Sequence, residues 1–106
     1  LSQTMVGPLT ASLLEQLHFN LAFMGTMGLT DKKGLTTSDP AEAFTKRLAM
    51  QRAQRVVLLT DSGKVGQVAF AQAGRLSDIH LLITDQHLKP ELARELRRKG
   101  PDVITV

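Results

Sequence analysis

The chain has 106 residues, no cysteine and a formal net charge of +3. This length allows one domain with a modest core, and the lack of cysteine excludes disulfides, cysteine nucleophiles and cysteine-ligated metals. No apolar run reaches the length of about 18 residues that a membrane span needs, and no basic-then-apolar stretch of secretory type opens the sequence. We therefore expect a cytoplasmic protein.

The positive charge is concentrated in one C-terminal segment that carries Lys89, Arg94, Arg97, Arg98 and Lys99. Cations near a helix C-terminus complement the helix dipole, which accounts for the last three of them. The chain has four Phe and neither Trp nor Tyr, so it offers few platforms for stacking single-stranded bases. We expect no direct nucleic-acid binding by this chain.

The first half of the chain alternates helical and extended patterns. The spacing of Leu9, Leu13 and Leu17 predicts a short amphipathic helix. Residues 19–24 form an apolar run that predicts a buried strand. Residues 25–39 contain three glycines and are expected to form a long loop, a kind that is usually functional or mobile.

A strong helix start follows this loop. Asp39 is a suitable cap, Pro40 fits the first turn, and Glu42 completes a capping box. The helix is expected to continue to about Ala53. The positions expected on its buried face are Ala41, Phe44 and Leu48.

The second half predicts further strands at 55–60, 68–71, 79–84 and 103–106, and a helix at 90–99. Strands that alternate with helices through short connections imply an α/β fold, a mostly parallel sheet with helices on both faces. Right-handed crossovers then place the strand ends at residues 25, 61 and 85 on one edge of the sheet.

The segment from Arg55 to Gly66 carries the clearest functional pattern. An apolar, β-branched run stops at Asp61, Ser62 and Lys64, as a buried parallel strand does when it reaches the rim of a sheet. Ligands of open α/β sheets bind at that rim, and a lysine there suits an anionic, hydroxylated molecule such as a sugar phosphate. A plain surface turn after a core strand is the alternative.

Other candidate residues allow two interpretations each. Gly25 and Gly28 either let a ligand approach the backbone or simply turn the chain. The Thr36 hydroxyl either binds a sugar or bonds local backbone. Glu42 and Lys46 either form a helix-surface ion pair worth roughly 0.2–0.5 kcal/mol, or one of them points into the cleft.

Asp85 follows the strand at 79–84, where it either caps and turns the chain or lies near a ligand at the same edge. The histidines, His18, His80 and His87, lack the spacing of helix-borne metal ligands. His80 alternates within a predicted strand and is expected to be structural. We expect no metal, no cofactor and no catalytic residue.

Five short motifs occur in a fixed order along the chain. They are FMGTMGL at 23–29, GLTT at 34–37, EA with KR at 42–47, VVLLTDSGK at 56–64, and LSDI with LITD between 76 and 85. Together they resemble the C-terminal sensor domain of DeoR-type bacterial transcriptional repressors. The chain departs from that pattern at Gly63, which replaces a serine, and at Met27 and Thr30, where many relatives carry acids.

The resemblance implies a fold shared with ribose-5-phosphate isomerase and glucosamine-6-phosphate deaminase. It implies that residues 1–106 are the later part of a sugar-phosphate-sensing domain in a homo-oligomeric repressor, and that a winged helix-turn-helix absent from this chain contacts DNA. The residues that it places in the effector pocket are Gly25, Gly28, Thr36, Asp61, Ser62 and Lys64. The residues that would flank the pocket are Glu42, Lys46 and Asp85.

Three functions remain open from the sequence. The first is this effector-sensing domain. The second is an aldose-ketose isomerase or an amino-sugar phosphate deaminase. The loss of acids at Met27 and Thr30, in and just after the segment 25–28 that we call the glycine loop, is unfavourable for such an enzyme, because its chemistry needs a positioned base. The third is a dimerisation module whose pocket is vestigial.

Overall fold

The computed structural model describes residues 18–106, so the helix expected over residues 9–17 lies outside the described part. The strands are β1 (Phe19–Met24), β2 (Gly28–Thr30), β3 (Gly34–Thr37), β4 (Ala53–Leu59), β5 (Ala71–Gly74), β6 (Leu81–Thr84) and β7 (Asp102–Thr105). The helices are α2 (Pro40–Arg52) and α3 (Pro90–Arg98), with the single 3-10 turns η1 (Ser62–Lys64) and η2 (Leu76–Asp78). None of the described helices is long and apolar enough to cross a membrane.

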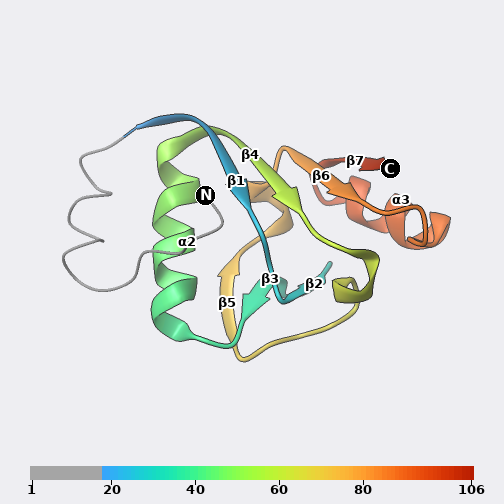
Figure 1. The fold of residues 1–106 in the computed structure, drawn as a ribbon, viewed down its shortest axis with the longest axis horizontal. Helices are drawn as coiled ribbons and strands as arrows, with labels where there is room; N and C mark the ends of the chain where they lie inside the picture. The colour runs from blue at the N-terminus through green and yellow to red at the C-terminus, as the bar shows by residue number, and fades with distance from the viewer. Residues whose placement is uncertain (1–17) are drawn as a thin grey trace.

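A four-stranded parallel sheet forms the centre of the fold, in the order β1-β4-β6-β7 (Figure 1). Met24 pairs with Leu58, and Leu59 pairs with Ile83, so the carboxyl ends of β1, β4 and β6 are level with one another. The prediction of an α/β fold with a mainly parallel sheet is therefore confirmed.

A second, antiparallel sheet replaces part of what we expected to be loop. Strands β2 and β3 form a hairpin within residues 25–39, and β3 also pairs with β5. The strand expected at 68–71 is wrong in position, since β5 begins at Ala71. The position of β5 could not be found locally, because its pairing with β3 joins segments that are distant in the sequence. The hairpin of β2 and β3 is a local pairing that the glycine content of residues 25–39 led us to expect as loop.

Helix α2 begins as predicted, with the Asp39 side chain accepting a hydrogen bond from the Ala41 backbone N–H at 3.0 Å. The predicted buried face is wrong, because the Phe44 side chain is 51% exposed. The helix packs closely against β5, where a Cβ on Gly74 would collide with Met50. The buried positions of the helix are Ala43, Thr45 and Met50.

The main hydrophobic core lies on one side of the parallel sheet. Met24, Val56, Leu58, Leu82 and Val103 point to this side and pack with residues of both α2 and α3. The expected arrangement of helices on both faces is therefore not found among residues 18–106. The strand order explains this, because right-handed crossovers that advance in one direction place their helices on the same face.

The opposite side of the sheet is apolar and partly exposed in the described part of the chain, although Val57, which is paired with Phe23 and Leu81 on this side, is buried. Leu21, Phe23, Leu59 and Ile104 occupy alternate positions there, and their side chains are between 42% and 46% exposed. We call these four residues the apolar sheet face. Parallel sheets are normally covered on both faces, so this surface is unusual for a self-contained α/β unit.

Candidate functional site

The carboxyl ends of three neighbouring strands meet at one edge of the parallel sheet. Gly25 follows β1, Asp61 lies two residues after β4, and Asp85 follows β6. The predicted convergence of these three positions is therefore confirmed. The Ser62 backbone N–H donates to Asp85 Oδ2 at 2.8 Å, which fixes the turn after β4 against the turn after β6.

Residues 61–66, which we call the Lys64 loop, are held in place by backbone contacts. The Lys64 N–H donates to the Asp61 carbonyl at 3.1 Å and closes the turn of η1. The Gly66 N–H donates to the Leu29 carbonyl at 2.8 Å, which ties the loop to β2. Gly66 has a φ of +94°, a conformation that favours glycine. The Asp61 side chain is exposed and that of Lys64 is half-buried, so the loop presents both charges on a rigid turn.

Asp85 connects the two turns through both of its carboxylate oxygens. Besides the bond from Ser62, its Oδ1 accepts the His87 backbone N–H at 2.9 Å. These hydrogen bonds stabilise the ionised carboxylate and so hold the pKa of Asp85 below its usual value. The bond from the Ser62 backbone N–H has the largest effect. The carboxylate therefore has the chain-turning role that was one of its two interpretations.

The two glycines of the glycine loop differ in their surroundings. A Cβ on Gly25 would meet no atom within 4 Å, so its backbone faces open space. A Cβ on Gly28 would lie 2.6 Å from Thr36 Oγ1 and would collide with the Gln67 carbonyl oxygen. Gly28 is thus required by packing within the protein, whereas Gly25 leaves room for a ligand.

Thr36 lies beneath this glycine loop in β3. Its side chain is only 3% exposed, and its hydroxyl accepts the Ala69 backbone N–H at 2.8 Å. The predicted residues therefore form two groups: Gly28 packs against Thr36 in the antiparallel sheet, while Ser62 and Asp85 join at the parallel-sheet edge. The Thr36 hydroxyl thus bonds backbone, but the backbone of a residue 33 positions along the chain and not the local backbone that the simpler interpretation expected.

Lys46 reaches the glycine loop from α2. Its Nζ donates to the Gly25 carbonyl at 2.9 Å. Burial lowers the pKa of Lys46, and the nearby Glu42 carboxylate opposes that shift. The half-buried amine therefore fixes the backbone beside the open space at Gly25.

Two threonines of this region were not identified from the sequence. Thr26 Oγ1 lies 2.8 Å from the Gly28 carbonyl and 3.1 Å from that of Thr36, which fixes the glycine loop. Thr84 precedes Asp85; its hydroxyl is buried, and no partner for it is found among the described residues. The sequence could have pointed to Thr84, because the same Thr-Asp pair occurs at the ends of β4 and β6.

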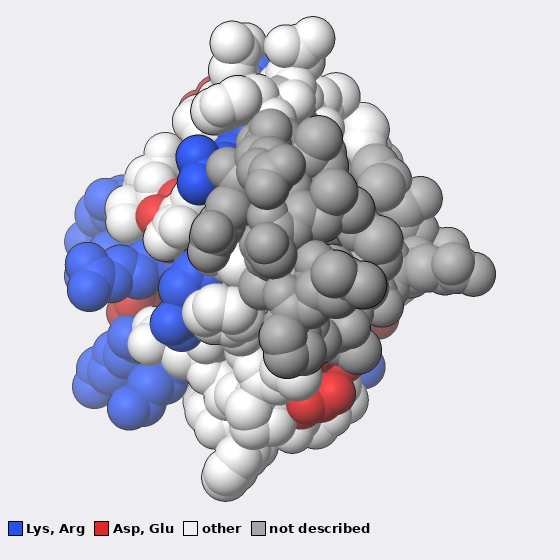
Figure 2. Space-filling model, turned by 90° about the vertical axis from the view of Figure 1, so that its left-hand side faces the viewer, with Lys and Arg blue, Asp and Glu red and all other residues white. Residues whose placement is uncertain are grey.

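The remaining polar groups have structural roles. His80 Nδ1 accepts the Val56 backbone N–H at 2.9 Å, which confirms the prediction of a structural histidine. Among residues 18–106, no cluster of histidines and carboxylates could hold a metal ion. Arg97 donates to the Val103 carbonyl at 3.0 Å and so connects the last turn of α3 to β7. Figure 2 shows Lys and Arg side chains gathered along one flank of the molecule.

Comparisons with known proteins place this arrangement in a class of regulatory domains. Residues 1–86 match the family described as the DeoR C terminal sensor domain. The chain is 37% identical over 103 residues to the HTH-type transcriptional regulator GlpR of Haloferax volcanii, covering 97% of this chain and 40% of that protein. It is 35% identical over 99 residues to the HTH-type transcriptional regulator GolR of Listeria innocua, covering 93% of this chain and 39% of that protein.

A third relative, the HTH-type transcriptional repressor GlcR of Bacillus subtilis, is 31% identical over 97 residues, covering 89% of this chain and 37% of that protein. The chain thus spans about two fifths of the length of these relatives. It belongs to the DeoR family of transcriptional regulators, within the ligand-sensing domain.

Proposed function

We propose that this domain binds a phosphorylated sugar or a related metabolite at the carboxyl edge of the parallel sheet, and that binding controls a separate DNA-binding domain. The observation that carries the proposal is the Lys64 loop. It is fixed on one side by Gly66 and Leu29 and on the other by Ser62 and Asp85. The backbone that carries Lys64 is therefore already in place, which lowers the ordering cost when the lysine binds a phosphate.

Each predicted ligand residue then has a proposed role. Lys64 contacts the phosphate, while Asp61 and the Ser62 hydroxyl bind sugar hydroxyls. Gly25 lets the ligand approach the backbone, because the space beside its Cα is free. Lys46 holds the Gly25 carbonyl in place from behind. Thr36 and Gly28 support this wall of the site by packing and do not contact the ligand.

The apolar sheet face supports a fold like that of the sugar-phosphate isomerases and deaminases. Strands β4, β6 and β7 advance away from β1 in one direction. Further strands wound in the opposite direction from β1 would place their helices over the apolar sheet face. β1 would then be the topological switch point, where α/β sheets bind their ligands, and Gly25 lies at that point.

The proposed role is binding without turnover. Isomerisation or deamination of a sugar phosphate requires a positioned general base. Both oxygens of the Asp85 carboxylate accept backbone N–H groups, and its lowered pKa makes it a weak base. We therefore expect no conversion of ribose 5-phosphate or glucosamine 6-phosphate by the full-length protein.

Control of DNA binding requires that the ligand favour one arrangement of the protein over another. We propose that the regulator is a homo-oligomer, in which contact of the effector with the Lys64 loop favours one arrangement of the subunits. The loop is coupled to β2 through Leu29 and to β6 through Asp85. It can therefore transmit a change at the ligand to both sheets.

The test is a thermal-shift screen of the full-length protein against a panel of sugar phosphates. A ligand present at a hundred times its Kd adds about 2.7 kcal/mol of stability, which is readily measured. Lys64→Ala is expected to weaken binding of the effector at least about tenfold, equivalent to about 1.4 kcal/mol. Lys32→Ala, which removes an exposed lysine from the turn between β2 and β3, is the matched control and should bind normally.

A shift that is lost in Lys64→Ala and kept in Lys32→Ala supports the proposal and identifies the effector. Equal affinity in both variants would remove Lys64 from the site. A panel without any stabilising compound would contradict the sugar-phosphate assignment and favour a domain whose pocket has lost its ligand.

A further inference from the structure

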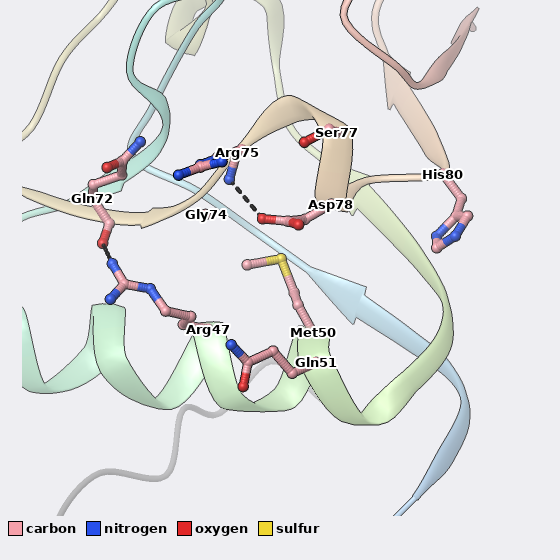
Figure 3. A pocket seen from close by; sticks show the side chains of 9 residues that line it. All are labelled: Arg47, Met50, Gln51, Gln72, Gly74, Arg75, Ser77, Asp78 and His80. Carbon is pink, nitrogen blue, oxygen red and sulfur yellow. Dashed lines mark hydrogen bonds between the residues drawn. The ribbon is translucent and has the colours of Figure 1, made fainter.

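A cavity lies at the other end of the parallel sheet, away from the Lys64 loop. It has a volume of about 620 Å³, opens to the surface, and is lined by residues of α2, β5 and η2 and by the residue that precedes β6 (Figure 3). His80 lies at this end of β6 and Asp85 at the opposite end. The strand rise of about 3.3 Å per residue separates these two positions by about 16 Å. A ligand in this cavity would therefore occupy a site distinct from the proposed effector site.

The polar groups around the cavity are mainly hydrogen-bond donors. Arg47 extends from α2 and donates to the Gln72 carbonyl at 2.6 Å, which fixes its guanidinium at the cavity wall (Figure 3). Arg75 lies across the cavity, at the residue before η2. Its backbone N–H donates to Asp78 Oδ2 at 2.9 Å, which holds that carboxylate against the backbone. The lining thus contains two guanidinium groups and one carboxylate, whose Oδ2 already accepts the Arg75 backbone N–H.

His80 adds a hydrogen-bond donor, and the hydrogen bond at its Nδ1 shows that this donor is Nε2. Because Nδ1 accepts the Val56 backbone N–H, that nitrogen carries no hydrogen. A neutral imidazole then has its hydrogen on Nε2, which can only donate. Met50 is the one large apolar side chain in the lining, so a purely hydrophobic ligand would gain little there.

We propose that this cavity is a second ligand site, which binds the oxyanion group of a small polar metabolite through Arg47 and Arg75, while His80 at the far end of the cavity donates to another part of the same molecule (Figure 3). Guanidinium groups bind phosphate and carboxylate oxygens in pairs, with charge-assisted hydrogen bonds. The cavity volume lies within the range of about 300–1,000 Å³ that small-molecule sites occupy. Ser77 and Gln51 supply further polar contacts for the rest of such a molecule.

The test is an amide NMR titration of the isotope-labelled full-length protein with inorganic phosphate and, separately, with acetate, at constant ionic strength. Saturable shifts are expected at the amides of Gly74, Arg75 and Ser77, and the anion that saturates at lower concentration identifies the preferred group. Arg75→Gln keeps the backbone bond to Asp78 and is expected to weaken binding about tenfold. The matched control is Arg98→Gln, which removes the same charge from an exposed position on α3.

Normal binding by Arg98→Gln together with weak binding by Arg75→Gln supports the site. Arg47→Gln provides the same comparison if the spectrum of Arg75→Gln is not that of a folded protein. Three results would overturn the proposal: shifts that do not saturate with either anion, shifts confined to residues 61–66, or equal weakening by Arg75→Gln and Arg98→Gln. The second of these would leave the effector site intact, so the two proposals can fail separately.

Discussion

Exchanging glycine for alanine at the two ends of the glycine loop should change stability in opposite directions. At Gly28 the new methyl group would lie 2.6 Å from Thr36 Oγ1 and nearer still to the Gln67 carbonyl oxygen. The Gln67 atom belongs to the backbone, and the Thr36 hydroxyl is bonded to Ala69, so neither can rotate away. Overpacking of this kind costs about 1–3 kcal/mol.

At Gly25 the methyl group would meet nothing within 4 Å. Gly25 does not have a positive φ, so alanine can adopt the same backbone conformation. Alanine then restricts the unfolded chain and should raise the free energy of unfolding by about 0.4–1 kcal/mol. Urea denaturation of the two variants measures the difference directly, and each kcal/mol corresponds to about 4–8 °C in Tm for a chain of this size.

A Gly28→Ala variant as stable as the parent would refute the close approach of β2 to residue 67, and with it the packing of the glycine loop. A marked loss of stability in Gly25→Ala would show that the space beside Gly25 is filled. The pair is informative because both substitutions add the same methyl group to the same loop.

Two further predictions test the helix face and the turn at the sheet edge. Met50→Ala should cost about 2–5 kcal/mol, whereas Phe44→Ala should stay within about 0.5 kcal/mol; the reverse order in urea denaturation would restore the buried face expected from the sequence. Asp85→Asn should lower Tm at neutral pH, because the Ser62 N–H favours the ionised carboxylate. A lowered folded pKa gives stability that is complete above the ordinary aspartate pKa and is lost as the pH falls through the lowered one. The Tm difference should therefore shrink in acid, and a constant difference would contradict this role.

The sequence predicted the parallel sheet well because its strands are signalled locally. The run at 55–60 is apolar and ends at polar residues, and β4 ends within one residue of the expected position. Asp39 and Pro40 also located the start of α2 correctly, because capping depends on neighbours in the sequence.

The antiparallel sheet and the face of α2 could not be found in this way. Strand β3 has four buried residues in succession, since it pairs on both sides and is covered by α2. Nothing in GLTT shows that its partner is 34 to 39 residues further along the chain. The same distant contact decides that Met50, and not Phe44, faces the interior.

For the candidate site, the sequence predicted where the residues lie better than it predicted what each of them does. The strand-end rule placed Gly25, Asp61 and Asp85 at one edge, as observed. It could not separate Gly25 from Gly28, because the difference depends on the carbonyl of Gln67 in another segment. It also could not show that Lys46 would bond to Gly25, since that contact spans 21 residues.

The apolar sheet face has a practical consequence for any study of this stretch of chain alone. Exposed aliphatic and aromatic surface associates non-specifically in water, because hydrophobic attraction has no directional preference. Two molecules that join through Leu21, Phe23, Leu59 and Ile104 would therefore associate in many orientations. Light scattering from such a sample would increase with protein concentration without reaching a defined stoichiometry, and the particle size would reflect this adhesion and not the symmetry of the regulator.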